Sequence, residues 1–196
     1  MKNLSCHNKP MTESKQAAYV FVDAANVWNV VKSKRKLVDY TKLKEFISST
    51  FDQDFCEVFY YESFPEQDTR DYDTAGKQKF FVYLKKALGF HVKKKALKRI
   101  KANDGAVEYI LEKGNMDVEI TIDAVHNIAK YNIAVFFTGD CDFLPLVNHI
   151  KSRGKKVYIF SSKGSISSEL KTGGDGYFDL VDQEGIWGKD LRHREK

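Results

Sequence analysis

The chain has 196 residues, of which 42% are hydrophobic, and its 32 Lys+Arg and 27 Asp+Glu give a net charge of +5. This length suits one domain with a sizeable core. No apolar stretch approaches the ~20 residues that span a membrane, and the first residues lack the apolar segment of a secretion signal. We therefore expect a cytoplasmic protein. Cys6, Cys56 and Cys141 are odd in number and far apart, which excludes a disulfide framework and a zinc knuckle.

The first half of the chain shows strand and helix patterns in turn. We expect, in chain order, a polar tail over 1–17, a buried strand over 19–23, a polar loop with Lys32, Lys34, Arg35 and Lys36, a helix over 40–47, a strand over 56–61 and a helix over 73–88. Asp39 is a suitable cap for the first helix, and Gly89 is suited to end the second. Glu62 and a turn at Ser63-Phe64-Pro65 should end the second strand.

Residues 90–111 carry a hairpin signal. Asn103-Asp104-Gly105 separates the runs 90–100 and 106–111, and this tripeptide favours a tight turn between strands. One arm holds six cations, namely Lys93, Lys94, Lys95, Lys98, Arg99 and Lys101. The hairpin is therefore either a nucleic-acid-binding surface or an edge strand that its lysines protect against aggregation.

The second half continues the alternation. We expect a helix over 115–131, a strand over 132–137, a helix over 143–150, a strand over 155–160, a short helix over 165–170, a last strand over 177–181 and a tail over 184–196. Strands that alternate with helices indicate right-handed crossovers and a mainly parallel sheet. The prediction is one α/β domain over 18–183 with a Rossmann-type sheet and an inserted basic β-hairpin.

Acidic residues stand where predicted strands end. Asp23 follows the first strand, Asp140 and Asp142 follow the strand over 132–137, and Asp117 opens the helix before that strand. Ligands of open α/β sheets bind outside the carboxyl ends of the strands, so these side chains converge if the first and fourth strands are neighbours. Two carboxylates ~5 Å apart repel by about 3 kcal/mol at an effective dielectric of ~20. A cation would relieve this repulsion, and oxygen ligands without His or Cys suit Mg²⁺ or Mn²⁺.

Such a site would support metal-assisted hydrolysis of a phosphate ester. Structural roles remain open for several residues: Asp142 could cap a helix, Asp117 could complement a helix dipole, and Asn26 could close a turn. Asp123 lies about 120° around the helix from Asp117, so it could miss the cluster. Glu62 also has a structural alternative.

Four motifs in order resemble the NYN domain family, in its LabA-like branch. They are Val22-Asp-Ala-Ala-Asn26, Lys113-Gly-Asn-Met-Asp117, Thr138-Gly-Asp-Cys-Asp-Phe143 and Gly154-Lys-Lys-Val157. The resemblance extends from about Tyr19 to Val181. It implies a PIN-like, Rossmann-type three-layer sandwich with metal-dependent ribonuclease activity.

By this resemblance the metal-binding acids are Asp23, Asp117, Asp140 and Asp142, with Asn26 and Thr138 as polar groups of the catalytic site. The sequence departs from the family pattern at Ala24, where a glycine is usual, and at Gly173-Gly174, which replace helical residues. No role is carried over to Asp175.

Our main hypothesis is a Mg²⁺- or Mn²⁺-dependent ribonuclease acting on single-stranded RNA. The expected nucleic-acid-binding residues are Lys93, Lys94, Lys95, Lys98, Arg99 and Lys113, with further cations at 32–36. The first alternative is a catalytically silent RNA-binding or regulatory module, which the anions facing phosphate disfavour. The second is a phosphohydrolase with an aspartyl phosphate, disfavoured because Ala25 stands where a second Asp is needed. A homo-oligomer is left open.

Overall fold

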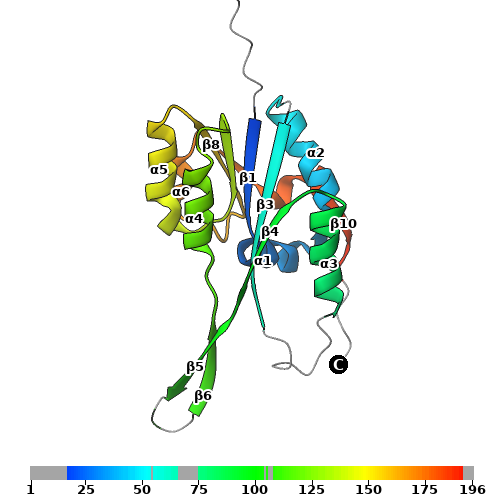
Figure 1. The fold of residues 1–196 in the computed structure, drawn as a ribbon, viewed down its shortest axis with the longest axis vertical. Helices are drawn as coiled ribbons and strands as arrows, with labels where there is room; N and C mark the ends of the chain where they lie inside the picture. Colours follow the sequence, from blue (N-terminus) through cyan, green and yellow to red (C-terminus); the bar gives the residue numbers. More distant parts are fainter. Residues whose placement is uncertain (1–16, 54, 66–74, 104, 106–107, 192–196) are drawn as a thin grey trace, which may run out of the picture.

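A six-stranded parallel sheet forms the centre of the protein, with strand order β4-β3-β1-β7-β8-β9 (Figure 1). The computed structural model describes residues 17–53, 55–65, 75–103, 105 and 108–191. The strands of the sheet are β1 (Ala17–Asp23), β3 (Phe55–Phe64), β4 (His91–Ala96), β7 (Ile133–Phe137), β8 (Lys156–Ser161) and β9 (Gly176–Asp179). The predicted parallel sheet is confirmed. Most of the expected tail over 1–17 lies outside the described residues, although Ala17 already belongs to β1.

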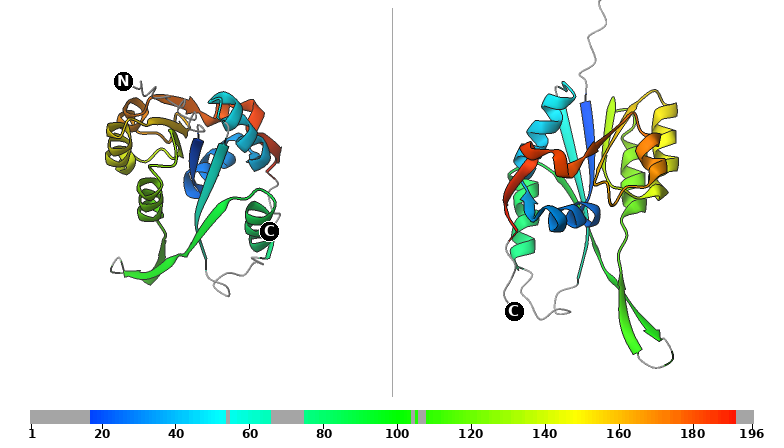
Figure 2. Two further views of the ribbon diagram at one scale, coloured as in Figure 1. Left: turned by 45° about the horizontal axis from the view of Figure 1, so that its top comes forward. Right: turned by 180° about the vertical axis from the view of Figure 1, so that it is seen from behind.

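Helices cover both faces of this sheet, as Figures 1 and 2 show. They are α1 (Ala24–Lys34), α2 (Tyr40–Thr50) and α3 (Ala75–Lys86) on one face, and α4 (Asp117–His126), α5 (Leu144–Ser152) and α6 (Ser168–Gly173) on the other. β1 supplies both cores by alternation: Val20 and Val22 pack with the first helix set, and Tyr19 and Phe21 with the second. The result is the expected α/β three-layer sandwich. In the part of the chain that is described, no helix has the length and apolarity to cross a membrane.

The order of strands reverses beside β1. From β1 the chain passes to β3 and β4 on one side, and then returns to β7, β8 and β9 on the other. β1 pairs with β3 and β7 in parallel, with Val22 opposite Tyr60 and Phe137. The carboxyl ends of β1 and β7 are therefore adjacent at a topological switch point, which is where such sheets bind ligands.

The basic hairpin differs from its prediction. The run over 90–100 divides at Leu97: β4 joins the central sheet beside β3, and β5 (Lys98–Asn103) pairs with β6 (Glu108–Lys113) in a separate antiparallel ribbon. Leu97 marks the change, since its backbone N–H donates to the Phe64 carbonyl at 3.0 Å. The ribbon projects from the body of the molecule (Figures 1 and 2).

Two segments predicted to be irregular are ordered. Where a polar loop with cations at 32–36 is expected, the structure has the end of α1 and the short strand β2 (Lys36–Val38). α1 forms because Val27, Val30 and Val31 lie on one helical face that packs into the core. The expected tail begins with the turn η3 (Glu184–Ile186) and β10 (Trp187–Asp190), which pairs with β2. Buried Ile186 and Trp187 hold this segment against the domain. The ordered domain thus extends beyond residue 183.

The other boundaries agree with the sequence patterns to within a few residues. Asp39 caps α2, accepting from the backbone N–H groups of Thr41 and Lys42 at 3.1 and 3.3 Å. Gly89 follows α3 with a φ of 72°, a conformation that favours glycine. β3 runs through Glu62 to Phe64, so the turn expected at Ser63 is wrong.

Candidate functional site

A pocket of about 400 Å³ lies at the carboxyl edge of the central sheet. It is lined by the acids Asp23, Asp117, Asp140 and Glu62 and by neutral residues that include Asn26, Trp28, Leu97, Gly114, Asn115 and Met116. The acids come from four places: the end of β1, the start of α4, the loop after β7, and β3. The prediction that distant aspartates converge at one place is therefore fulfilled by the geometry for Asp23, Asp117 and Asp140. We call this the acid pocket.

Asp23 both ends β1 and begins α1. Its carboxylate accepts from the backbone N–H of Ala25 at 3.0 Å and from Asn26 Nδ2 at 2.8 Å. Burial raises the pKa of Asp23, the hydrogen bonds from Asn26 and Ala25 oppose this, and the Asp140 charge raises it further. The side chain is thus an N-cap that is also held inside a negatively charged pocket.

Asn26 connects the two strands of the switch point. Its Nδ2 lies 3.2 Å from Thr138 Oγ1, and its Oδ1 accepts from the backbone N–H of Gly139 at 3.1 Å. Thr138 is buried, and its Oγ1 also accepts from the backbone N–H of Asp140 at 3.3 Å. Asn26 and Thr138 therefore position Asp23 and Asp140; Asn26 lines the acid pocket, whereas Thr138 is buried behind it.

Gly139 fixes the path of the loop that carries Asp140. A Cβ at this position would lie 2.1 Å from the Ser165 backbone oxygen, so no side chain fits. Asp140 then caps the short turn η1 (Cys141–Phe143) by accepting from the Asp142 N–H at 3.0 Å. Ligand atoms of Asp140, Cys141 and Asp142 lie within 4.8 Å of one another. Asp142 is exposed and stands outside the residues that line the acid pocket.

Asp117 is oriented by Asn115, for which no role is predicted from the sequence. Asn115 Nδ2 lies 2.5 Å from Asp117 Oδ2, and Asn115 Oδ1 accepts from the Asp117 N–H at 2.7 Å. Burial raises the pKa of Asp117, and the charges of Asp140, Asp23 and Asp142 raise it further. The Asn-x-Asp spacing is the sequence signal that could have identified this clamp.

The acid pocket fits a divalent cation by its donor set. Asp23, Asp117 and Asp140 offer carboxylate oxygens, and Asp142 lies close enough for its charge to act on Asp117. Burial is the main cause of the raised pKa values of Asp23 and Asp117, and the neighbouring carboxylates add to it, so a bound cation would relieve both effects. Mg²⁺ and Mn²⁺ prefer such oxygen ligands.

The structure shows which residues contact Glu62, Asp123 and Asp175, three acids whose part in the site the sequence left open. Glu62 lines the acid pocket, but it is engaged by an ion pair with Lys77 and by the Tyr60 hydroxyl at 2.9 Å. Asp123 is buried against the Tyr61 hydroxyl at 2.7 Å and Lys93 Nζ at 2.6 Å, away from the pocket lining. Asp175 accepts from the Val157 N–H at 2.8 Å. Asp123 and Asp175 thus have structural partners.

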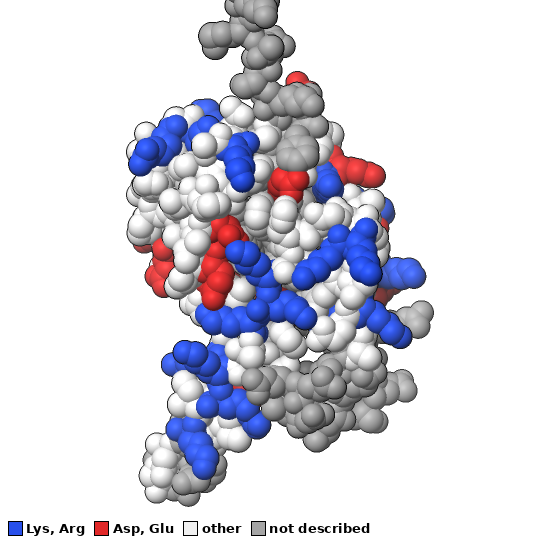
Figure 3. Space-filling view, in the orientation of Figure 1, with Lys and Arg blue, Asp and Glu red and all other residues white. Residues whose placement is uncertain are grey.

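The predicted nucleic-acid-binding lysines do not form one uniform surface. Lys93 and Lys95 pair with Asp123 and Glu119 of α4 at 2.6 and 2.8 Å. Lys94 alternates to the other face of β4, where its Nζ lies 5.3 Å from the Phe64 ring centroid. Figure 3 shows that cationic side chains extend from the body of the protein along the projecting ribbon, beside a group of acids.

Lys98 and Lys113 of the β5–β6 ribbon, unlike Lys93 and Lys95 of β4, have no acidic partner among the described residues. Lys98 and Lys113 are exposed and directly opposite each other in the β5–β6 register, and no acid among the described residues lies within ion-pair distance of either. Arg99 Nε lies 3.9 Å from Glu112 Oε1. Lys113 immediately precedes Gly114, which lines the acid pocket. A positive surface therefore leads toward this pocket.

Comparisons with known proteins agree with the fold and the motif order. The family model described as NYN domain matches residues 17–181. The chain is 24% identical over 164 residues to the low amplitude and bright protein LabA of Synechococcus elongatus, covering 83% of each chain. An uncharacterized protein of Methanocaldococcus jannaschii is 31% identical over 105 residues, which are 48% of this chain and 44% of that protein. The crystal structure of a Vibrio parahaemolyticus protein of unknown function superposes with a TM-score of 0.66 and 23% identity, covering 90% of this chain and 99% of that one.

Proposed function

The chain belongs to the NYN domain family, a PIN-like nuclease family, and we propose that it is a nuclease as well. It would hydrolyse phosphodiester bonds of single-stranded RNA with Mg²⁺ or Mn²⁺. The observation that carries the proposal is the acid pocket, in which Asp23, Asp117 and Asp140 come from separate elements to the switch point of the sheet. Helix capping could explain the presence of any single one of these aspartates. It does not explain why three line the same pocket.

Asp23, Asp117 and Asp140 would hold the cation, with the exposed Asp142 close to Asp140. A divalent cation supplies charge stabilisation to a phosphodiester transition state and makes water a stronger nucleophile. Asn26 and Thr138 hold the two strand ends in register, so the carboxylates keep a fixed separation. Asn115 holds Asp117 in the same way.

RNA would approach along the ribbon. Lys98 and Lys113 would neutralise backbone phosphates on the way to the acid pocket, since contacts of this kind supply much of nonspecific nucleic-acid affinity. The exposed Trp28 at the pocket would offer a ring to an unpaired base, which favours single-stranded substrate.

A second candidate is an RNA-binding module without turnover. The observation in its favour is that the ribbon projects from the body and needs no acid to bind phosphates. It predicts RNA binding that survives Asp140→Asn, with no cleavage by the wild-type protein.

Cleavage of end-labelled single-stranded RNA distinguishes the two. We expect cleavage in Mn²⁺ or Mg²⁺, none in EDTA, and a loss of at least about a hundredfold in Asp140→Asn, because one of the cation's ligands loses its charge. The matched control is Asp190→Asn, an exposed acid in β10. Equal cleavage by wild type and Asp140→Asn would refute the nuclease proposal.

A further inference from the structure

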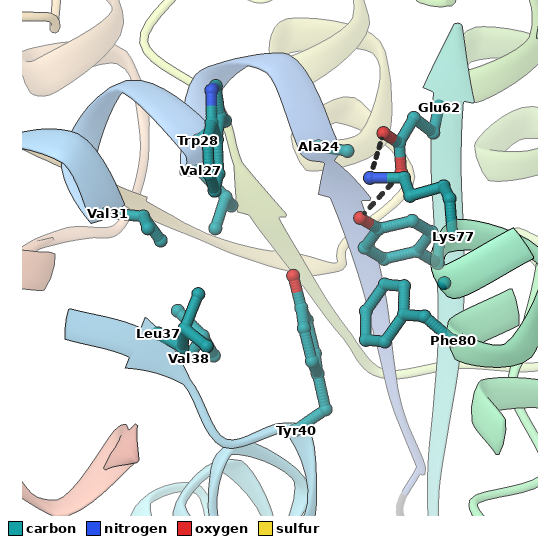
Figure 4. Close-up of a pocket in the computed structure, with 12 residues that line it drawn as sticks. Ala24, Val27, Trp28, Val31, Leu37, Val38, Tyr40, Glu62, Lys77 and Phe80 are labelled. Atoms are coloured by element: carbon teal, nitrogen blue, oxygen red, sulfur yellow. Dashed lines mark hydrogen bonds and ion pairs between the residues drawn. The ribbon is translucent and has the colours of Figure 1, made fainter. Parts of the chain in front are cut away.

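A second, larger cavity of about 680 Å³ adjoins the acid pocket (Figure 4). It lies between α1, β2, the start of α2, the end of β3 and α3, and its volume is in the range of ligand-binding cavities. Ala24, Trp28 and Glu62 line both spaces. A ligand with one part in the acid pocket could therefore place a neighbouring part in this cavity.

The walls of the cavity are mostly apolar and include the aromatic rings of Trp28, Tyr40, Tyr60 and Phe80. α1 presents Ala24, Val27, Trp28 and Val31 at helical spacing, and Phe80 of α3 lies across from them (Figure 4). Trp28 remains 48% exposed although its ring is large and apolar. Because Trp28 borders the cavity, its exposed ring is available to a ligand that enters this space.

Polar groups occupy one side of the same cavity. Tyr40 directs its hydroxyl into the space, and Glu62 and Lys77 form an ion pair at its border (Figure 4). The Tyr60 hydroxyl donates to Glu62 Oε2 at 2.9 Å. These groups give one side of the cavity hydrogen-bond donors and acceptors, which a flat ring with donors and acceptors on its edge could use and a purely aliphatic ligand could not.

We propose that this cavity binds one base of the RNA strand whose phosphate lies at the acid pocket. The inference rests on the proposed function, because that function supplies the RNA. Trp28 and Phe80 would contact the faces of the base, and Tyr40 and the Glu62–Lys77 pair would contact its edge. We call the cavity the base pocket.

The test compares two polymers with the same phosphates. Fluorescence anisotropy would give the Kd of labelled oligouridylate and of an abasic ribose-phosphate chain of equal length, both in EDTA to prevent turnover. We expect the wild-type protein to prefer the base-containing polymer by roughly 5- to 100-fold, the range that one stacked base contributes.

Trp28→Ala should abolish this preference without changing the affinity for the abasic chain. Because Trp28 is half exposed, the variant should fold, and thermal unfolding checks this. Tyr83→Ala is the matched control: Tyr83 is an exposed aromatic residue of α3 that does not line the cavity. An unchanged preference in Trp28→Ala would overturn the proposal.

Photocrosslinking with 4-thiouridine-substituted RNA provides a second measurement. We expect crosslinks in peptides of α1 or α3, and crosslinks confined to the β5–β6 ribbon would contradict the base pocket. Saturable decanoate binding that Trp28→Ala removes, without a base preference, would identify an apolar-ligand cavity and would also overturn it.

The outcomes separate this inference from the nuclease proposal. Metal-dependent cleavage together with equal affinity for both polymers refutes the base pocket alone. A base preference that depends on Trp28, without cleavage in any metal, supports the base pocket and refutes only the nuclease.

Discussion

Asn26 Nδ2 lies 3.2 Å from Thr138 Oγ1, and this contact joins the carboxyl ends of β1 and β7. The same amide also bonds to Asp23 and to the backbone of Gly139. One side chain therefore holds together the two segments that deliver Asp23 and Asp140.

Replacing Asn26 by alanine should destabilise the protein by about 1–3 kcal/mol, because the Asp23 carboxylate, Thr138 hydroxyl and Gly139 N–H each lose a partner. Urea unfolding measures this difference. Asn29→Ala in the same helix controls for helix propensity, since Asn29 is exposed. If both variants unfold at the same urea concentration, the amide does not join the strands.

Gly139→Ala should cost about 1–3 kcal/mol of stability and lower RNA cleavage, because the new methyl group would collide with the Ser165 backbone oxygen and displace Asp140. Gly164→Ala is the control, as a Cβ there meets nothing within 4 Å. Urea unfolding and cleavage rates check both effects. A Gly139→Ala protein as stable and as active as Gly164→Ala would show that the loop tolerates a side chain.

The raised pKa values of Asp23 and Asp117 predict a pH dependence without metal. Raised carboxyl pKa values mean that the folded state holds protons more tightly than the unfolded state. The contribution of these two groups to the free energy of unfolding is therefore fully present below the unfolded-state pKa of 3.8, and it is lost as pH rises through the folded-state pKa. Asp140→Asn removes one repulsive charge and keeps the Oδ1 that accepts from Asp142 N–H.

In EDTA, Asp140→Asn should therefore be more stable than wild type at pH 7, and the difference should shrink below about pH 4. Urea unfolding over this pH range gives the two curves. A wild-type protein that is more stable than the variant at pH 7 in EDTA would mean that the acids do not repel one another.

Lys98 and Lys113 should contribute to RNA affinity through charge. The double variant Lys98→Ala/Lys113→Ala should reduce the slope of log K against log salt by about 1–2, because each phosphate contact on a single strand contributes ~0.7. Lys189→Ala, in β10, is the control. An unchanged slope would exclude the ribbon from the RNA path.

Lys93 should contribute to stability instead. Its ammonium pairs with buried Asp123 at 2.6 Å, so Lys93→Ala should destabilise the protein by about 1–2 kcal/mol and leave the salt slope nearly unchanged. Lys94→Ala, on the opposite face of β4, is the comparison for both measurements. A large change of slope in Lys93→Ala would instead place Lys93 on RNA.

The parts of the fold that sequence predicted depend on local patterns. The apolar runs before Asp23 and Thr138 identified β1 and β7, and strand-helix alternation implied a parallel sheet whose switch point brings Asp23 and Asp140 together. Asp39 was recognised as a cap because capping involves only neighbouring residues.

The parts that sequence missed depend on distant partners. The cations at 32–36 led to the prediction of a polar loop where α1 lies, whereas Val27, Val30 and Val31 form an unbroken apolar face that packs against the sheet. Asp123 could not be separated from the acids of the pocket, since Tyr61 and Lys93, which engage it, come from other strands. The prediction of a tail over 184–196 is wrong for Trp187, because its partner β2 lies far away in the chain.

Crystals soaked in Mn²⁺ and measured at the manganese edge test most directly whether the three aspartates hold a cation. We expect an anomalous peak within coordination distance of the carboxylates of Asp23, Asp117 and Asp140, and none in crystals of Asp140→Asn. A saturated soak without a peak in the acid pocket, or with an equal peak in the variant, would contradict a shared cation site and with it the proposed nuclease.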